Sequence, residues 1–330
     1  MRSSGTTSSA ARLSSSSGYS PRRPSRGSRP SLITLGPRVS GALLEGRPVV
    51  ALESTIFSNL GLPPPANIEA HDRCRQAVIA GGAEPALTAV LEGKATVGVE
   101  ADRVATICGP ARKVGQRDLA VAIRQRWAYG ATTVSASLAL AAAAELQVFA
   151  TGGIGGVHRD AHRSFDVSAD LNAIASYKVI TVSSGAKVFL DLSRTLEYLE
   201  THSVPVLGFR CDEFPAFYSR SAGLPVPHRV ESAAEVAAIA REHWSLGGGG
   251  ILLVNPVPEA YAVEMSILES AVDRALARAE GTVGAAITPI VLSEIASLTD
   301  GQSIASNVAL AESNAAVAAE VATALRAERR

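Results

Sequence analysis

From about Gly41 onward, short runs of apolar residues alternate with longer stretches that have the apolar pattern of helices. The short runs are typical of buried strands, and the longer stretches are typical of helices that cover a sheet. This alternation predicts a three-layer α/β/α fold with a central, mostly parallel (mixed) sheet. The expected strands are Pro48–Leu52, Leu87–Leu91, Thr96–Val99, Val148–Ala150, Lys178–Val182, Pro205–Phe209 and Gly250–Val254, and the expected helices are Asn67–Gly81, Ala131–Ala144, Ser232–Leu246, Pro258–Glu280 and Ile304–Arg326.

Residues 1–40 differ in composition from the rest of the chain: they are rich in Ser, Arg, Pro and Gly and contain no Asp or Glu. Arg- and Ser-rich segments without acidic residues are typical of organelle transit peptides and also of disordered extensions. Because prolines and glycines work against an amphipathic helix, we expect a disordered extension. Residues 41–330 show no internal repeat and no clear linker, which predicts a single catalytic domain.

The composition suits a globular enzyme with a large core. Of the 330 residues, 47% are hydrophobic and 19% are charged, and the net charge at pH 7 is zero. A neutral chain gives no indication of a nucleic-acid partner. The three cysteines, Cys74, Cys108 and Cys211, are odd in number and far apart, which indicates a reducing compartment. The longest apolar run, about Val134–Ala144, is too short to span a bilayer, so we expect a soluble, cytoplasmic protein with no membrane partner.

The segment Thr151–Leu171 combines glycines with a dense group of polar side chains, directly after a predicted strand. Its four glycines let backbone amides approach a ligand closely. The hard oxygen ligands Asp166, Ser168 and Asp170 suit Mg²⁺ or Mn²⁺, which use one or two carboxylates and keep several waters. Three other interpretations stay open: a glycine-rich turn, helix capping by Ser168 or Asp170, and a zinc pair formed by the two histidines of the segment.

Lysine is rare in this chain: only four of the 31 basic residues are lysine, and the others are arginine. A desolvated lysine can become a neutral amine nucleophile, whereas arginine stays protonated. Lys187 lies just beyond a predicted strand, in the segment SSGAK, where open α/β sheets usually bind ligands. It could form an imine with an aldehyde sugar. A phosphate contact or the capping of a carbonyl group is the alternative.

Glu53 follows the first predicted core strand, Pro48–Leu52, and so lies, like Lys187, at the edge formed by the C-terminal ends of the strands. A carboxyl group there could donate a proton if burial raised its pKa, and a structural hydrogen bond to Ser54 or Thr55 is the alternative. Lys113 precedes the segment GATTV, which opens the alanine-rich helix. Backbone amides at a helix N-terminus, with Thr133 beside them and Lys113 as counter-charge, form a natural phosphate site.

Together these segments resemble the pseudouridine-5′-phosphate glycosidases, the family that includes indigoidine synthase A-like proteins. The resemblance runs from about Pro48 to Ala322. It rests on ALESTI, GGAEPAL, GATTV, FATGGIGGVHR, FDVSADL, SGAK, RTLEYLET, VPV, FPAFYSR, NPVP and Thr288–Leu292, all in one order. It implies a homotrimer of α/β/α subunits that reversibly converts pseudouridine 5′-phosphate and water into uracil and ribose 5-phosphate, a glycosidase reaction of the carbon–oxygen lyase class.

The resemblance also implies a role for each candidate residue. Lys187 would be the nucleophile that forms an imine with the ring-opened sugar, and Glu53 would be the proton donor. Asp166 would be the protein ligand of one Mn²⁺ per subunit, with Mg²⁺ or another divalent ion as the alternative metal. An imine provides an electron sink for breaking the carbon–carbon bond between base and sugar. The residues implied in substrate binding are Lys113, Thr133, Val134, Ser168, Ala169, Asp170, His158 and Asn307.

The chain departs from the family pattern at three places. Ser58–Pro63 contains no histidine where the family often has one, Gln116 replaces an arginine, and Ser183 and Ser184 occupy a small or cysteine position. None of these changes removes a proposed catalytic residue. Three other functions stay open: an enzyme acting on a related C-glycoside or phosphosugar, an imine-forming aldolase, and a phosphosugar-binding module without catalysis.

Overall fold

The central sheet is built from short apolar segments that are buried along their whole length. In the computed structural model, which describes residues 33–278 and 287–327, every side chain of β2 (Val49–Leu52) and β11 (Ile251–Val254) is buried. Such runs favour strands that are covered by helices on both faces. The other strands are β1 (Ile33–Leu35), β3 (Glu84–Leu91), β4 (Lys94–Val97), β5 (Arg112–Val114), β6 (Tyr129–Thr132), β7 (Val148–Ala150), β8 (Ile180–Ser183), β9 (Val206–Phe209) and β10 (His228–Val230).

These strands form one eleven-stranded mixed sheet. Its main path has the order β1-β4-β3-β2-β7-β8-β11-β9-β10, and β6 branches from β3 and pairs with β5. All neighbours from β3 to β10 along this path are parallel, whereas β4 and β6 run antiparallel to β3. The predicted α/β fold with a mostly parallel, mixed sheet is therefore confirmed.

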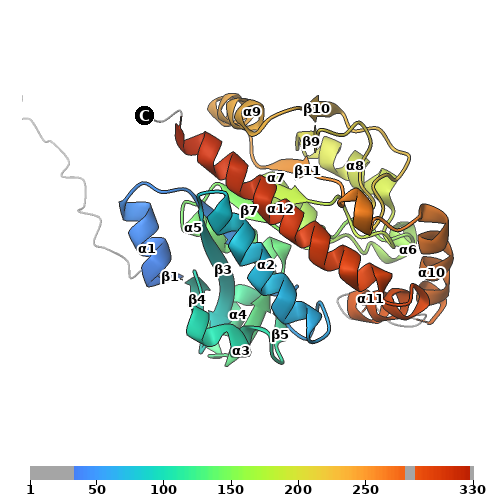
Figure 1. Ribbon diagram of the computed structural model, residues 1–330, viewed down its shortest axis with the longest axis horizontal. Helices are drawn as coiled ribbons and strands as arrows, with labels where there is room; N and C mark the ends of the chain where they lie inside the picture. The colour runs from blue at the N-terminus through green and yellow to red at the C-terminus, as the bar shows by residue number, and fades with distance from the viewer. Residues whose placement is uncertain (1–32, 279–286, 328–330) are drawn as a thin grey trace, which may run out of the picture. The chain divides into compact units, whose positions relative to one another are not determined.

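Helices cover both faces of the sheet (Figure 1). In this view α2 (Ala66–Ala80) and α12 (Gln302–Ala327) lie side by side in front of the sheet, and α12 contacts β2, β7 and β8. On the other face α5 (Val134–Ala143) packs against the sheet and against α7 (Ala169–Ser176). The other helices are α1 (Pro37–Leu44), α3 (Val104–Ile107), α4 (Leu119–Arg124), α6 (Ala161–Ser164), α8 (Leu192–Thr201), α9 (Ala233–Ser245), α10 (Met265–Arg278) and α11 (Ile287–Leu298).

Small residues allow α2 and α12 to pack closely. A Cβ atom placed on Gly81, at the end of α2, would lie 2.5 Å from the Cβ of Ala319, which is closer than two carbon atoms can approach. By length and composition alone, α12 could cross a membrane, but 67% of its most apolar window is buried inside the protein. We therefore interpret α12 as a helix that packs its apolar residues into the core of the protein.

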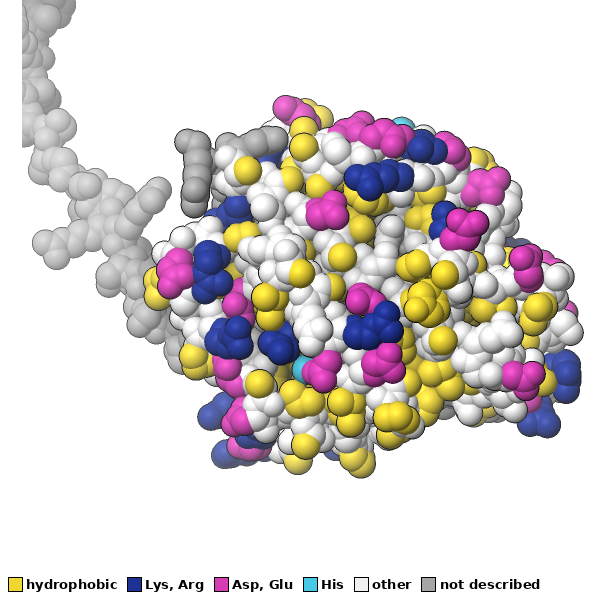
Figure 2. All heavy atoms as spheres, viewed as in Figure 1, with side chains coloured by type: hydrophobic (Ala, Val, Ile, Leu, Met, Phe, Trp, Pro, Cys, Tyr) yellow, Lys and Arg dark blue, Asp and Glu magenta, His cyan; other side chains and the backbone are white. Residues whose placement is uncertain are grey.

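Charged side chains of both signs are interspersed on the face shown in Figure 2, the face that α2 and α12 cover. Arg73 of α2, for example, pairs with Glu69 of the same helix and with Glu312 of α12. On this face there is no continuous basic stripe of the kind that nucleic-acid-binding proteins carry. The mixed surface matches the zero net charge of the chain.

Several boundaries expected from the sequence are wrong by two or more residues, and three of these errors change the description of the fold. The boundary expected at residue 40 falls inside α1, because residues 33–35 already form β1 and pair with β4; residues 1–32 lie outside the described part. The alanine-rich helix begins at Val134 rather than Ala131, because residues 129–132 form β6 between β3 and β5. The helix expected from Pro258 begins at Met265, after a separate 3₁₀ turn. At residue 40 and at the start of the alanine-rich helix, the pairing of a strand with distant segments overrides the local sequence pattern.

The topology brings several chain segments to one edge of the sheet. The strands β2, β7 and β8 are parallel neighbours, so their carboxyl ends lie together. The strand β6 returns to the same edge, where the N–H of Thr55 donates to the carbonyl of Thr132 at 3.2 Å. Residues that follow these four strand ends therefore meet, at the kind of edge where α/β proteins bind ligands.

Candidate active site

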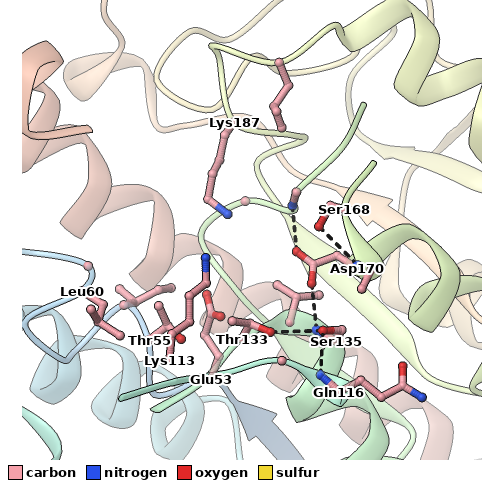
Figure 3. Close-up of a pocket in the computed structure, with 18 of the residues that line it drawn as sticks. Glu53, Thr55, Leu60, Lys113, Gln116, Thr133, Ser135, Ser168, Asp170 and Lys187 are labelled. Atoms are coloured by element: carbon pink, nitrogen blue, oxygen red, sulfur yellow. Dashed lines mark hydrogen bonds between the residues drawn. The ribbon is translucent and has the colours of Figure 1, made fainter. Parts of the chain in front are cut away.

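A cavity of about 520 Å³ opens at this edge of the sheet (Figure 3). Its volume is within the range of small-molecule sites. Of the eleven site residues proposed from the sequence, ten line the cavity, and Asn307 does not. Asn307 is a buried residue of α12 that lies beside Gly152. The ten lining residues are Glu53, Lys113, Thr133, Val134, His158, Asp166, Ser168, Ala169, Asp170 and Lys187.

The carboxyl group of Glu53 lies at the cavity wall, immediately after β2, and is buried. Its Oε1 accepts a hydrogen bond of 2.6 Å from Oγ1 of Thr151. The two hydroxyl groups that follow Glu53 in the chain instead contact Thr132. Burial raises the pKa of Glu53 to about 7, against the opposing effects of the Lys187 charge and the Thr151 hydrogen bond. A carboxyl group that is half protonated near neutral pH can serve as a proton donor.

Two lysines point into the cavity with their amines toward one another (Figure 3). Lys113 belongs to β5, and Lys187 follows the end of β8. Burial lowers the pKa of the Lys113 amine, and the nearby charge of Lys187 lowers it further. Both effects disfavour the charged form of the Lys113 amine.

The turn that presents Lys187 requires glycine at position 185. Gly185 has a φ of +71°, and a Cβ atom there would lie 1.9 Å from the carbonyl oxygen of Pro215. The N–H of Lys187 donates to the carbonyl of Ile154 at 3.1 Å. This hydrogen bond holds the lysine-bearing turn against the glycine-rich loop.

Asp170 lines the cavity and uses both carboxylate oxygens to bind backbone amides (Figure 3). Oδ1 accepts from the N–H of Ser135 at 2.9 Å, and Oδ2 accepts from the N–H of Gly155 at 3.0 Å. Asp170 thereby joins the first turn of α5 to the glycine-rich loop. Ser168 is the N-cap residue of α7, and its Oγ accepts from the N–H of Asp170 at 3.3 Å. Capping, one of the interpretations left open, is therefore the observed role of Ser168.

The N-terminus of α5 forms one end of the cavity. Thr133, whose N–H donates to the carbonyl of Val114 at 3.0 Å, lies there with Val134. The positive end of the helix dipole and the amine of Lys113 both favour an anion at this position. Gln116, where the family resemblance led us to expect an arginine, donates from Nε2 to the hydroxyl of Tyr177 at 2.7 Å.

Asp166 and His158 lie on a loop that folds back on itself. The N–H of His158 donates to the carbonyl of Asp166 at 3.1 Å, and the two side chains approach to 3.8 Å between Nε2 and Oδ2. Burial lowers the pKa of His158. His162 is exposed and does not line the cavity, so the zinc pair considered from the sequence is not formed.

The residues that the structure describes contain no group of three or more His, Cys, Asp or Glu side chains arranged to hold a metal ion. A divalent ion at Asp166 would therefore have one protein carboxylate as ligand, with water and substrate oxygens in its other positions. Mg²⁺ and Mn²⁺ tolerate such a shell, whereas a structural zinc ion does not. The donor set thus fits a hard, hydrated cation.

Neither the apolar residues that line the cavity nor the hydrogen-bond partner of Glu53 was predicted from the sequence. Ile56, Leu60, Phe217 and Leu292 line the cavity and suit an apolar part of a ligand, but nothing in the local sequence distinguishes them from core residues. Thr151 could have been identified, because it follows a predicted strand directly, as Glu53 does.

The chain matches a known family, described as indigoidine synthase A like protein, over residues 38–324. It is 46% identical to a protein of Sorangium cellulosum over 298 residues, which cover 89% of this chain and 93% of the relative. It is also 46% identical to a protein of Caldanaerobacter subterraneus over 299 residues, which cover 89% of this chain and 96% of the relative. Both relatives are named pseudouridine-5′-phosphate glycosidase.

A solved structure shares the fold over nearly the whole chain. It is that of a prealnumycin C-glycosynthase in complex with ribulose 5-phosphate, with 37% sequence identity and a TM-score of 0.82. The match covers 90% of this chain and 98% of that protein. The family resemblance identified from the sequence motifs is confirmed by these comparisons.

Proposed function

The chain belongs to the indigoidine synthase A-like family, and we propose that it is an enzyme that reversibly cleaves the C-glycosidic bond of pseudouridine 5′-phosphate. The products are uracil and ribose 5-phosphate. The observation that carries this proposal is one cavity that holds a buried carboxyl group, Glu53, whose pKa lies near 7, together with a lysine amine, Lys187. A carbon–carbon glycosidic bond requires both groups, because no leaving nitrogen or oxygen is available for simple protonation.

Lys187 supports the first stage of this reaction. Its amine would form a bond to C1′ while the bond from C1′ to the ring oxygen breaks and that oxygen takes up a proton. Cleavage of the bond from C1′ to the base then leaves C1′ as a protonated imine, stabilised by the nitrogen lone pair. Water hydrolyses this imine to ribose 5-phosphate and restores the amine of Lys187.

Glu53 supports the cleavage stage. The proton of its carboxyl group would pass to C5 of the base, and the electron pair of the bond between C1′ and C5 then returns to the base ring. Because burial holds the pKa of Glu53 at about 7, a substantial fraction of the enzyme carries this proton at neutral pH. A carboxyl group with an ordinary pKa would be almost completely ionised.

The remaining lining residues support the binding of a phosphorylated sugar. We assign the phosphate to the N-terminus of α5, where Thr133, Val134 and Lys113 line the cavity. Ser168, Ala169 and Asp170, which also line the cavity, would contact the sugar, and the apolar lining residues would face the base. His158 and the more distant Asn307 would act near base or sugar.

We propose Asp166 as the protein ligand of Mn²⁺, with Mg²⁺ or another divalent ion as the alternative. When bound, such an ion would polarise substrate oxygens and help to orient the sugar. The side chain of Asp166 lines the cavity, and no competing cluster of protein ligands occurs in the part of the chain that the structure describes. We also propose a cytoplasmic homotrimer; the free cysteines fit a reducing compartment.

An enzyme acting on a related C-glycoside is the second candidate. It is favoured by the solved C-glycosynthase structure, which contains ribulose 5-phosphate. Release of uracil from pseudouridine 5′-phosphate, measured with and without Mn²⁺, tests the proposed function. A protein that releases no uracil but forms an imine with a pentose 5-phosphate would contradict the proposed function and favour the second candidate.

A further inference from the structure

The hydrogen bond from Thr151 makes the two oxygens of the Glu53 carboxyl group inequivalent. Oγ1 of Thr151 donates to Oε1 at 2.6 Å, and within the described part of the chain no second hydrogen-bond donor reaches this carboxyl group. Glu53 lines the cavity and Thr151 does not. Oε1 is therefore engaged on the buried side, and Oε2 is the oxygen left for a bound molecule.

Thr151 is itself held in place through its backbone. It follows β7 directly and is 3% exposed. Its N–H donates to the carbonyl of Val182 in β8 at 3.0 Å, and its carbonyl accepts from Nδ2 of Asn314 at 2.8 Å. Since a β-branched side chain has few χ1 choices, a fixed backbone also restricts the position of the hydroxyl group.

Asn314 connects Thr151 to the centre of the fold. This residue of α12 is completely buried, and its Nδ2 also donates to the carbonyl of Gly152 at 3.2 Å. Its Oδ1 accepts from Nδ2 of Asn255, which follows β11, at 3.0 Å. Three parts of the protein therefore determine where the Thr151 hydroxyl lies: the end of β8, the residue that follows β11, and α12.

Resting on the proposed function, we infer that Thr151 is a positioning residue: its hydroxyl keeps Oε1 of Glu53 as the hydrogen-bond acceptor and thereby places the transferable proton on Oε2. A protonated carboxyl group has one carbonyl oxygen, which accepts, and one hydroxyl oxygen, which donates. A donor fixed beside Oε1 favours the arrangement with the proton on the other oxygen. That oxygen is the one available to the base.

The hydrogen bond from Thr151 to Glu53 also stabilises the carboxylate that remains after the proton has been transferred. The bond between Oε2 and hydrogen breaks, the proton joins C5 of the base, and Glu53 is left as a carboxylate. Thr151, Lys187 and Lys113 stabilise this negative charge, whereas burial and the charge of Asp170 oppose it. Removal of the Thr151 hydroxyl should therefore misplace the proton and also raise the pKa of Glu53.

Thr151→Val and Thr151→Ser test this inference, because valine keeps the shape without the hydroxyl and serine keeps the hydroxyl. Thr299→Val, which removes a buried hydroxyl far along the chain between α11 and α12, is the control. For each variant, kcat and KM for uracil release are measured across pH, along with borohydride trapping of ribose 5-phosphate at Lys187. Thermal melting checks the fold.

We expect Thr151→Val to lower kcat about tenfold with little change in KM, as loss of orientation does. The decline of kcat with rising pH should move to higher pH by about one unit, because a hydrogen bond to the carboxylate has been lost. Thr151→Ser should keep a kcat and a pH dependence close to those of the wild type. Trapping at Lys187 should match the wild type in all variants, since imine formation with the free sugar needs no proton on the base.

Unchanged kcat and pH dependence in Thr151→Val would overturn the inference, and so would a serine variant as impaired as the valine variant. A parallel loss of trapping at Lys187 would also overturn it, because Thr151 would then support the loops and not the proton. A wild-type protein that is trapped at Lys187 but releases no uracil would instead contradict the proposed function. The two failures are thus distinguishable.

Discussion

Replacement of Glu53 by glutamine should stabilise the protein while it removes activity. Glutamine has the same shape, cannot ionise, and can still accept the hydrogen bond from Thr151 through its carbonyl oxygen. In the wild type, the buried carboxyl group has its pKa raised to about 7 from an ordinary value of 4.5. The buried negative charge is therefore a source of instability that the variant lacks.

The size of this effect follows from the pKa and depends on pH. At low pH the group is protonated in both the folded and the unfolded chain, and stability is unaffected. As pH rises from about 4.5 to 7, the unfolded chain loses the proton and the folded chain keeps it, so wild-type stability falls. Each pKa unit corresponds to about 1.4 kcal/mol, so the loss is about 3 kcal/mol above pH 7.

Melting temperatures of the wild type and Glu53→Gln, recorded from pH 5 to pH 8 at one protein concentration, provide the assay. A difference of 3 kcal/mol corresponds to an increase of roughly 5–10 °C for the variant at pH 8, with a much smaller increase at pH 5. Glu197→Gln, a change at an exposed position on α8, is the matched control and should show no such trend. A melting difference that stays constant across this pH range, or a less stable variant at pH 8, would refute the reasoning.

Three other predictions concern the cavity. Lys187→Ala should abolish uracil release and borohydride trapping, while Lys187→Arg keeps the charge and should be equally inactive; mass spectrometry that finds the trapped sugar on a different lysine would contradict this. Chelation should remove activity and Mn²⁺ should restore it, and the Asp166→Asn variant should need far more Mn²⁺ to reach its half-maximal rate. Full activity in metal-free protein would argue against the metal assignment. Asp170→Asn should lower the free energy of unfolding, measured with denaturant, by about 1–3 kcal/mol, because the side-chain amide has one oxygen and can accept from only one of the N–H groups of Ser135 and Gly155. A variant as stable as the wild type would show that these hydrogen bonds contribute little.

Much of the candidate site could be located from the sequence because the proposed catalytic groups follow strand ends. Glu53 after β2 and Lys187 after β8 were both found in this way, and the parallel pairing of β2, β7 and β8 brings them together. Because the chain contains few lysines, Lys187 was one of only a few candidates for an amine nucleophile. The family motifs supplied the roles, which composition and spacing could not.

Other parts of the site depend on contacts between residues far apart in the chain. The expected helix Ala131–Ala144 includes Ala131 and Thr132, yet these two residues belong to β6, which lies between β3 and β5. Asp170 was expected to face the sugar, and its hydrogen bonds to Ser135 and Gly155 become visible only when α5 and the glycine-rich loop meet. Phe217 and Leu292 reach the cavity from distant loops and helices.

The sequence by itself determined the α/β class, the order of the main strands and helices, and the residue types that follow the strand ends. These properties depend on local periodicity and residue type, which are readable along the chain. Only the tertiary structure decided that Glu53 is buried against Thr151, that its pKa lies near 7, and that Asn314 holds this arrangement from α12. The reason is physical: a pKa and a hydrogen-bond direction depend on solvent exclusion and on partners that folding brings from about 98 and 163 residues away.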